Sequence, residues 1–187
     1  MATHEQVAKV LQFRRKIETD ITAKHLTAVE AKDLVDICRD MQLRLVATNG
    51  VFDLLHLGHL TLLSESKKLG DLLIVAMNSD KSVHAIKGPN RPICDERTRR
   101  LQLQHCHYVD MVVVFDEESP GWLWPLLRPA VVTKGCDFVD RRIPEMDSIE
   151  RYGGRFVAIP GRYDQTTRIV ERILRAEKNQ SPAAGTP

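Results

Sequence analysis

Residues 48–59 read T-N-G-V-F-D-L-L-H-L-G-H and directly follow the apolar run L-R-L-V-A at 43–47. The apolar run predicts a buried strand and the leucines after Asp53 predict a helix, so the stretch spans a strand-to-helix junction. His56 and His59 are three residues apart, which puts both on one face of the first helical turn. Gly58 places no side chain between them. This junction decides how the rest of the chain is interpreted.

A helix N-terminus presents free N–H groups and a partial positive charge, which favour phosphate. With two imidazole donors and a glycine that allows close approach to the backbone, the junction describes a phosphate-binding corner. The chain contains neither G-x-x-x-x-G-K-[ST] nor G-x-G-x-x-G, so the two histidines carry this hypothesis. A single histidine beside an apolar helix is more often structural, but a pair at this spacing is harder to explain by structure alone.

Short apolar runs alternate with amphipathic stretches along the chain. Strands are predicted at 43–48, 72–77, 111–115, 130–133 and 155–159, and helices at 57–69, 81–86, 96–106, 120–127, 144–152 and 166–177. Strands that are apolar on both faces and alternate with helices predict an α/β fold, with a parallel sheet of about five strands covered on both faces. Ligands bind outside the carboxyl ends of the strands in such sheets, which is where the histidines lie.

We expect three segments: an N-terminal helical extension (1–41), one α/β domain (42–178) and a disordered tail (179–187) of small and polar residues. The composition, 43% hydrophobic and 28% charged over 187 residues, suits one globular domain. A net charge of +2 implies no general nucleic-acid affinity, and no apolar stretch predicts a membrane span or a secretory signal. Four cysteines without C-x-x-C spacing fit a cytoplasmic protein.

The stretch F-D-L-L-H-L-G-H resembles the H-x-G-H signature of the cytidylyltransferase-like nucleotidyltransferases, and the resemblance extends from about Leu26 to Ile173. K-G-P-N-R-P-I (87–93), V-V-T-K-G-C-D-F (131–138) and T-T-R-I-V-E-R-I (166–173) are most similar to one subgroup. That subgroup is the D-glycero-D-manno-heptose 1-phosphate adenylyltransferases, the transferase half of the bifunctional heptose enzyme. The resemblance implies a Rossmann-like nucleotidyltransferase domain.

The resemblance also implies a reaction, in which a nucleoside triphosphate is joined to a phosphorylated acceptor and pyrophosphate is released. Catalysis would consist of positioning and of charge stabilisation at the α-phosphate, with Mg²⁺ held mainly by the nucleotide phosphates. By the same resemblance, the catalytic residues are His56, His59 and Lys67. The implied nucleotide-binding residues are Asn49, Gly50, Val51, Phe52, Gly58, Arg99, Arg162, Thr166 and Thr167, and the implied substrate-binding residues are Asp53, Lys134 and Asp137.

Several of these residues have a structural interpretation beside the functional one. Lys67 is equally an exposed helical lysine, and Arg99 is equally part of a surface ion pair. The two threonines at 166–167 also serve as helix caps, which is compatible with phosphate binding. Asp53 either orders its own loop or meets the acceptor, whereas Lys134, at the end of the predicted fourth strand, lies on the ligand edge. Trp122 and Trp124 point apart on a short helix, so we expect one of them to pack against the sheet.

The chain departs from the heptose subgroup at two loops. Cys136 replaces a glycine of the usual K-G-G-D, and Gln165 replaces a serine before the last helix, where Arg162 offers a cation. Three functions therefore stay open: an adenylyltransferase that uses ATP and a sugar 1-phosphate, a cytidylyltransferase that uses CTP and glycerol 3-phosphate or a similar small alcohol, and a non-catalytic nucleotide-binding protein. The N-terminal extension packs on a twin subunit, since family members are often homodimers, or lies on the surface.

Overall fold

The sheet is fully parallel, with five strands in the order β3-β2-β1-β4-β5. The computed structural model describes residues 8, 32–33, 35–36, 39–135, 138, 142–161 and 166–180, with the backbone alone for 178–180. The strands are β1 (Leu45–Gly50), β2 (Leu72–Asn78), β3 (Met111–Phe115), β4 (Val131–Lys134) and β5 (Arg155–Ala158). All five predicted strands are confirmed, and β1 continues two residues further towards the histidines than predicted.

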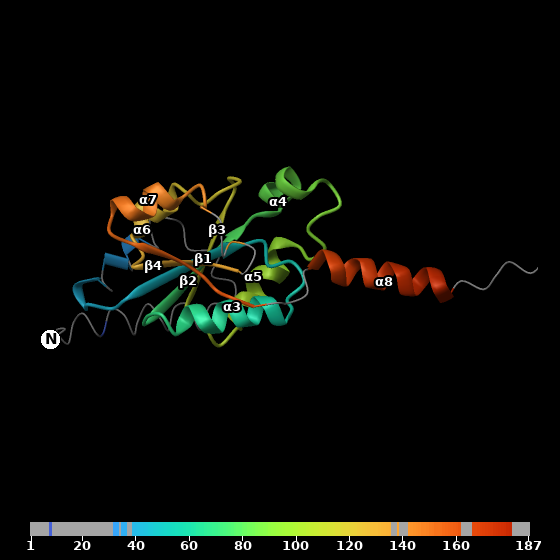
Figure 1. The fold of residues 1–187 in the computed structure, drawn as a ribbon, viewed down its shortest axis with the longest axis horizontal. Helices are drawn as coiled ribbons and strands as arrows, with labels where there is room; N and C mark the ends of the chain where they lie inside the picture. The colour runs from blue at the N-terminus through green and yellow to red at the C-terminus, as the bar shows by residue number, and fades with distance from the viewer. Residues whose placement is uncertain are drawn as a thin grey trace, which may run out of the picture.

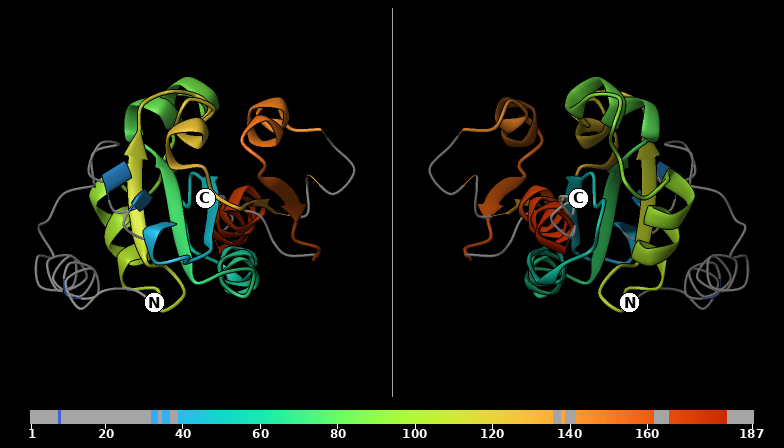
Figure 2. Two further views of the ribbon diagram at one scale, coloured as in Figure 1. Left: turned by 90° about the vertical axis from the view of Figure 1, so that its left-hand side faces the viewer. Right: turned by 90° about the vertical axis from the view of Figure 1, so that its right-hand side faces the viewer.

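Helices connect the strands, and these are α3 (Leu57–Lys67), α4 (Asp80–Lys87), α5 (Glu96–Gln104), α6 (Leu123–Leu127), α7 (Met146–Arg151) and α8 (Thr166–Gln180). Helices α6 and α7 cover one face of the sheet and α3 and α5 cover the other (Figures 1 and 2). Helix α6 begins at Leu123 rather than at Pro120 as predicted. Ser119, which precedes the predicted helix, donates its hydroxyl hydrogen to Glu145.

Alternate residues of each central strand enter two separate cores, because neighbouring side chains of a strand point to opposite faces. Ala47 packs on the α6 and α7 face, whereas Val46 packs on the α3 and α5 face. Trp124 is fully buried in the first core and Trp122 is 44% exposed, which confirms that only one of the two tryptophans packs against the sheet.

Buried hydroxyl groups fix helix α3 to the middle of the sheet. Thr48 Oγ1 donates to the carbonyl of Thr133 at 2.9 Å, and Thr133 Oγ1 lies 2.7 Å from Ser66 Oγ of α3. Gly70 follows α3 where a Cβ atom would lie 2.6 Å from the carbonyl oxygen of Arg44, so only glycine lets the chain return this close to β1. These contacts set where the first turn of α3 meets the carboxyl edge of the sheet.

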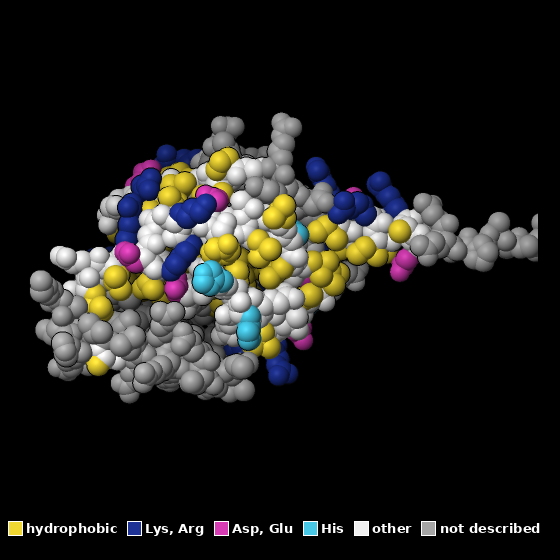
Figure 3. Space-filling view, turned by 90° about the horizontal axis from the view of Figure 1, so that it is seen from below, with side chains coloured by type: hydrophobic (Ala, Val, Ile, Leu, Met, Phe, Trp, Pro, Cys, Tyr) yellow, Lys and Arg dark blue, Asp and Glu magenta, His cyan; other side chains and the backbone are white. Residues whose placement is uncertain are grey.

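Helix α8 runs outward from the body of the molecule (Figure 1). Hydrophobic side chains run from the body along one side of α8, and Lys and Arg side chains lie on another side (Figure 3). The helix ends at Gln180, two residues inside the predicted disordered tail; residues 181–187 and most of the N-terminal extension lie outside the described residues. Within the described part of the chain, no helix is both long enough and apolar enough to span a membrane.

Candidate active site

The two histidines of the junction lie together at the start of α3. His56 is the N-cap residue and His59 is in the first turn, and their rings stack with centroids 3.9 Å apart and an interplanar angle of 24°. The His56 side chain makes no capping hydrogen bond. The backbone N–H groups of the first turn therefore keep the capacity to bind an anion beside two imidazoles. The structure thus brings together the pair that the sequence singled out.

Phe52 forms the support behind His59. Its ring centroid lies 5.1 Å from that of His59, and the side chain is 2% exposed. The backbone of Phe52 is left-handed, with φ of 51°, a conformation that is strained for a bulky residue and is concentrated at functional sites. A Cβ atom on Gly50 would lie 3.2 Å from the Phe52 ring. A strained turn therefore sets the height of the imidazole above the sheet edge.

Burial lowers the pKa of His59 to about 4, and the positive charge of His56 adds to the decrease. A backbone hydrogen bond to Leu54 and the carboxylate of Asp53 oppose this shift. His59 is consequently neutral at pH 7, where it donates one N–H group without carrying charge. A phosphate placed against this ring would raise its pKa, because a negative charge stabilises the imidazolium form.

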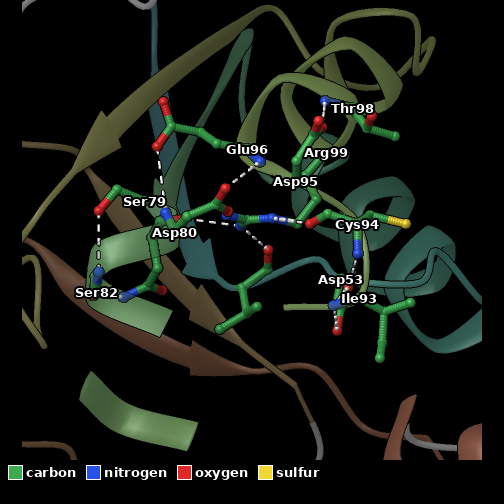
Figure 4. Close-up of polar contacts among 12 residues, drawn as sticks. Asp53, Ser79, Asp80, Ser82, Ile93, Cys94, Asp95, Glu96, Thr98 and Arg99 are labelled. Carbon is green, nitrogen blue, oxygen red and sulfur yellow. Dashed lines mark hydrogen bonds and ion pairs between the residues drawn. The ribbon is translucent and has the colours of Figure 1, made fainter. Parts of the chain in front are cut away.

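Asp53 orders the loop before α5. Its carboxylate is 3% exposed and accepts hydrogen bonds from the backbone N–H groups of Ile93 (2.9 Å) and Cys94 (2.8 Å) (Figure 4). It also accepts a hydrogen bond from Arg91 Nη1 (3.0 Å). Both carboxylate oxygens are used in these contacts. Of the two roles predicted for Asp53, the structure supports the ordering of the loop, and the contact with substrate stays a prediction.

Arg99 is a buried residue that joins several strand ends and loops, and we call it the Arg99 hub. Its guanidinium donates to three backbone carbonyls, those of Val51 (2.7 Å), Asn78 (2.8 Å) and Cys94 (3.0 Å), and Nη2 donates to Asp80 Oδ1 at 2.6 Å (Figure 4). The side chain is 0% exposed. The interpretation as a surface ion pair is therefore wrong, and the nucleotide contact stays a prediction. Arg99 joins the ends of β1 and β2 to the start of α4 and to the loop before α5.

Lys67 lies at the opposite edge of the sheet from the histidines. Its ammonium group donates to Asp110 Oδ2 at 2.5 Å and to the carbonyl of Asp71 at 2.6 Å, and these residues precede β3 and β2. Since α3 rises by 1.5 Å per residue, Lys67 is about 16 Å along the helix from His56. This lysine ties the amino ends of two strands to α3, away from the histidines, and its catalytic role stays a prediction.

Lys134 ends β4, at the carboxyl edge of the sheet as predicted. Its Nζ atom lies 3.8 Å from Glu145 Oε1 and 4.9 Å from the ring centroid of Phe138. Burial lowers the pKa of Lys134, and the Glu145 carboxylate opposes that decrease. No sequence signal pointed to Glu145, because its closeness to Lys134 arises only in the folded chain.

The remaining predicted residues divide between the site and the undescribed segments. Asn49 ends β1 with Gly50, and its buried Oδ1 has no hydrogen-bond partner among the described residues. Thr166 and Thr167 open α8, which begins beside the N-terminus of α3 (Figures 1 and 2). Gly58 lies in the first turn of α3. Two predicted residues, Asp137 and Arg162, are outside the described part of the chain.

Sequence reasoning gave no role to two cations near the histidines. Lys87 is close enough to contribute to the lowered pKa of His59, and burial and Arg91 lower the pKa of Lys87 itself. Arg91 pairs with Asp53 at 3.0 Å. The motif K-G-P-N-R-P contains both residues and was the signal that could have identified them.

Comparison with known proteins is consistent with this geometry. The chain is 42% identical over 146 residues to the bifunctional protein HldE of Syntrophotalea carbinolica, and 43% identical over 136 residues to the protein of that name from Geobacter metallireducens. These matches cover 76% and 71% of this chain, but only 29% and 27% of the relatives, so the chain spans less than a third of their length.

Solved structures show the same fold. The lipopolysaccharide core biosynthesis protein of Thermoplasma volcanium superposes with a TM-score of 0.54 at 33% identity, over 65% of this chain and 99% of that protein. Pantoate-beta-alanine ligase of Francisella tularensis superposes with a TM-score of 0.56 at 12% identity, over 87% of this chain and 82% of the ligase, and shows the fold alone. The cytidylyltransferase-like family model matches residues 47–171, which include the histidine pair, the Arg99 hub and Lys134. The chain belongs to the cytidylyltransferase-like family of nucleotidyltransferases.

Proposed function

We propose that this protein transfers the AMP group of ATP to a sugar 1-phosphate of the heptose 1-phosphate type, with release of pyrophosphate. The observation that carries the proposal is the stacked pair of His56 and His59 at the N-terminus of α3, beyond the carboxyl end of β1. The resemblance of 87–93 and 131–138 to the heptose subgroup, together with relatives named HldE, favours ATP and a sugar phosphate over the other substrates.

In the proposed reaction, an oxygen of the acceptor phosphate attacks the α-phosphorus of ATP. The new P–O bond forms as the bond to the bridging oxygen breaks, and the electron pair leaves with pyrophosphate. His56 and His59 donate hydrogen bonds to the phosphate oxygens on which charge builds up, and the first-turn amides of α3 assist them. Thr166 and Thr167, at the start of α8, hold the β- and γ-phosphates. Binding energy from both substrates fixes the in-line geometry.

Mg²⁺ belongs to the proposal as an ion that the nucleotide carries into the site. It would reduce the negative charge of the phosphates, which is the chemistry that it supplies in phosphoryl and nucleotidyl transfer. Within the described residues, there is no group of three or more His, Cys, Asp or Glu side chains that could hold a metal ion. The residues present fit an ion whose ligands are phosphate and water. ATP is supplied in the cytoplasm, which is the compartment that the proposal requires.

The test is pyrophosphate release with Mg²⁺, measured separately with ATP and CTP against heptose 1-phosphate, other sugar 1-phosphates and glycerol 3-phosphate. ATP-dependent release with a sugar 1-phosphate is the expected result. Release that requires CTP and glycerol 3-phosphate would replace the proposal by a cytidylyltransferase. Nucleotide binding by calorimetry without release from any acceptor would favour a non-catalytic binding protein.

We also propose that two copies of the chain associate. Support comes from exposed apolar side chains on α3 and α8: Leu57 is 66% exposed, and Ile173 and Leu174 are each 52% exposed. Covering such groups releases ordered water and favours association. Analytical ultracentrifugation should give a dimer for the wild type and a monomer for the double variant Ile173→Glu, Leu174→Glu; a monomeric wild type at micromolar concentration would contradict the proposal.

A further inference from the structure

A lysine and a glutamate are buried side by side at the end of β4 without a hydrogen bond between them. Lys134 Nζ and Glu145 Oε1 are 3.8 Å apart, which is beyond hydrogen-bond distance, and the two side chains are 12% and 3% exposed. The Phe138 ring lies under the ammonium group, 4.9 Å away at its centroid. The ammonium donors of Lys134 are therefore not consumed by the carboxylate.

The Glu145 carboxylate is satisfied at only one of its two oxygens. Ser119 Oγ donates to Oε1 at 2.5 Å, and this contact holds the carboxylate in place. The other oxygen, Oε2, is buried and has no hydrogen-bond partner among the described residues. A buried acceptor without a donor raises the free energy of the folded state, so a ligand that brings a donor gains affinity by pairing with it.

The pair lies one strand away from the histidine corner. Strand β4 pairs directly with β1, with Thr133 in register with Thr48, so Lys134 follows at the height of Asn49. Neighbouring strands are about 4.8 Å apart, which is within the reach of one small substrate. Thr133 bonds to Ser66 and so faces α3, whereas the side chain of Lys134, one residue later, lies with Glu145 and Phe138 on the face of α6 and α7. The pair and the histidines therefore meet only over the carboxyl ends of the strands. An acceptor with its phosphate at the histidines can extend across this edge.

Resting on the proposed function, we propose that Lys134 and Glu145 form the subsite for the hydroxyl groups of the acceptor, and that the acceptor is a polyhydroxylated sugar phosphate. One hydroxyl donates to Glu145 Oε2, and that hydroxyl or its neighbour accepts from Lys134 Nζ. Hydroxyl groups fit because each both donates and accepts. A phosphate or carboxylate offers no donor to Oε2, and an ammonium group would be repelled by Lys134. The Phe138 ring supplies an apolar surface for the C–H groups of a sugar.

The experiment measures kcat/KM with D-glycero-β-D-manno-heptose 1-phosphate and its monodeoxy analogues. A site built to hydrogen-bond a hydroxyl discriminates strongly against analogues that lack it. With the wild-type protein, we expect kcat/KM for one monodeoxy analogue to be about 100-fold or more below that for the parent substrate. In Glu145→Ala, kcat/KM for the parent substrate should fall towards the value for that analogue, so that the two values differ by less than about 10-fold. Glu145→Gln should restore part of the difference in kcat/KM.

The matched control is Glu150→Gln, an exposed carboxylate of α7, the helix that directly follows Glu145. Its carboxylate lies 3.9 Å from Arg142. The control should change neither the discrimination nor the KM for ATP. In Glu145→Ala the loss of the carboxylate lowers the pKa of Lys134 further, so the acceptor KM should begin to rise at a lower pH than in the wild type. A purely structural role for Glu145 would change the melting temperature without moving this pH profile.

Two negative results are distinguishable. If the wild type releases pyrophosphate with every deoxy analogue within about 3-fold of the parent substrate, or if Glu145→Ala keeps the full discrimination, this subsite is wrong while nucleotidyl transfer stands. Equal activity with glycerol 3-phosphate and the heptose phosphate has the same meaning. If the wild type releases no pyrophosphate with any sugar phosphate, the proposed function itself has failed.

Discussion

The two halves of the carboxyl edge differ in how their polar groups are satisfied. Around β1 and β2, Arg99 and Asp53 are buried with hydrogen bonds to the loops and strand ends around them. Around β4, Oε2 of Glu145 is buried with no hydrogen-bond partner among the described residues, and Lys134 Nζ lies 3.8 Å from Oε1 of the same carboxylate. The first half is assembled by its own contacts before any ligand binds. The second half has bonding capacity left for a ligand.

This difference separates two tasks that one edge of a sheet performs. A rigid frame holds the phosphate-binding corner in a fixed geometry, which positioning catalysis requires because small displacements are costly. Polar groups left without partners discriminate between ligands, because only a complementary ligand satisfies them. Substitutions in the frame should therefore affect folding or turnover broadly, whereas substitutions near β4 should affect the choice of acceptor.

The largest expected effect is a loss of turnover when a histidine of the phosphate-binding corner is replaced. His59→Ala should lower kcat by about 10²- to 10⁴-fold, because one donor to the developing charge is lost. The melting temperature should stay close to that of the wild type, since His59 is only partly buried. Stopped-time assays of pyrophosphate release with saturating ATP measure the effect. A folded His59→Ala protein with wild-type kcat would remove this histidine from the mechanism.

The frame is tested by Arg99→Met. This change leaves three backbone carbonyls and Asp80 without their donor, so we expect a loss of about 3–5 kcal/mol in the free energy of unfolding. Arg99→Lys should recover little, because one ammonium group cannot reproduce the fork of the guanidinium. Urea denaturation gives the values, and Arg97→Met, an exposed arginine on the same helix, is the control. If Arg99→Met lowers the free energy of unfolding by less than about 1 kcal/mol, Arg99 does not hold this frame together.

The low pKa of His59 predicts a pH-dependent stability. The unfolded chain binds a proton near pH 6.5 but the native state only near pH 4, so stability falls as the pH drops between these values and no further below them. One pKa unit corresponds to about 1.4 kcal/mol, so the contribution reaches at most about 3 kcal/mol. The difference in unfolding free energy between the wild type and His59→Gln, measured from pH 7 to pH 4, isolates it from other titrating groups.

A constant difference across that pH range would show that His59 titrates normally. With ATP bound, the His59 contribution to the pH dependence of stability should be smaller, because bound phosphate raises the pKa of the imidazole towards its unfolded value. We also expect proton uptake when ATP binds near pH 5.5. Calorimetry in buffers of different ionisation enthalpy measures this uptake.

The smallest expected effect comes from the amino edge. Lys67→Met removes a half-exposed ion pair with Asp110, so the free energy of unfolding should fall by about 1 kcal/mol or less. The kcat should stay within about 2-fold of the wild type, because Lys67 is about 16 Å along α3 from the histidines. Assays run beside His59→Ala give the contrast, and a 100-fold loss of kcat in Lys67→Met would support its predicted catalytic role.

Local patterns predicted the fold and the histidine corner well. The apolar runs place all five strands, and the spacing of His56 and His59 depends only on helical geometry. The bonds that Lys67 and Arg99 make within the protein were not predicted, because motif resemblance identifies a residue type without saying which way its side chain points. Glu145 was missed because its partner Ser119 is 26 residues away, and contacts over such a separation depend on how the chain folds back.

The bonds of Arg99 have a further consequence for which sequences this fold tolerates. Three of its four acceptors are backbone carbonyls, which every amino acid supplies. The identities of Val51, Asn78 and Cys94 are therefore not fixed by the hub, and these positions are open to change in evolution or in directed libraries as long as Arg99 and Asp80 stay. The sequence near the site can therefore change while Arg99 still holds the ends of two strands in place.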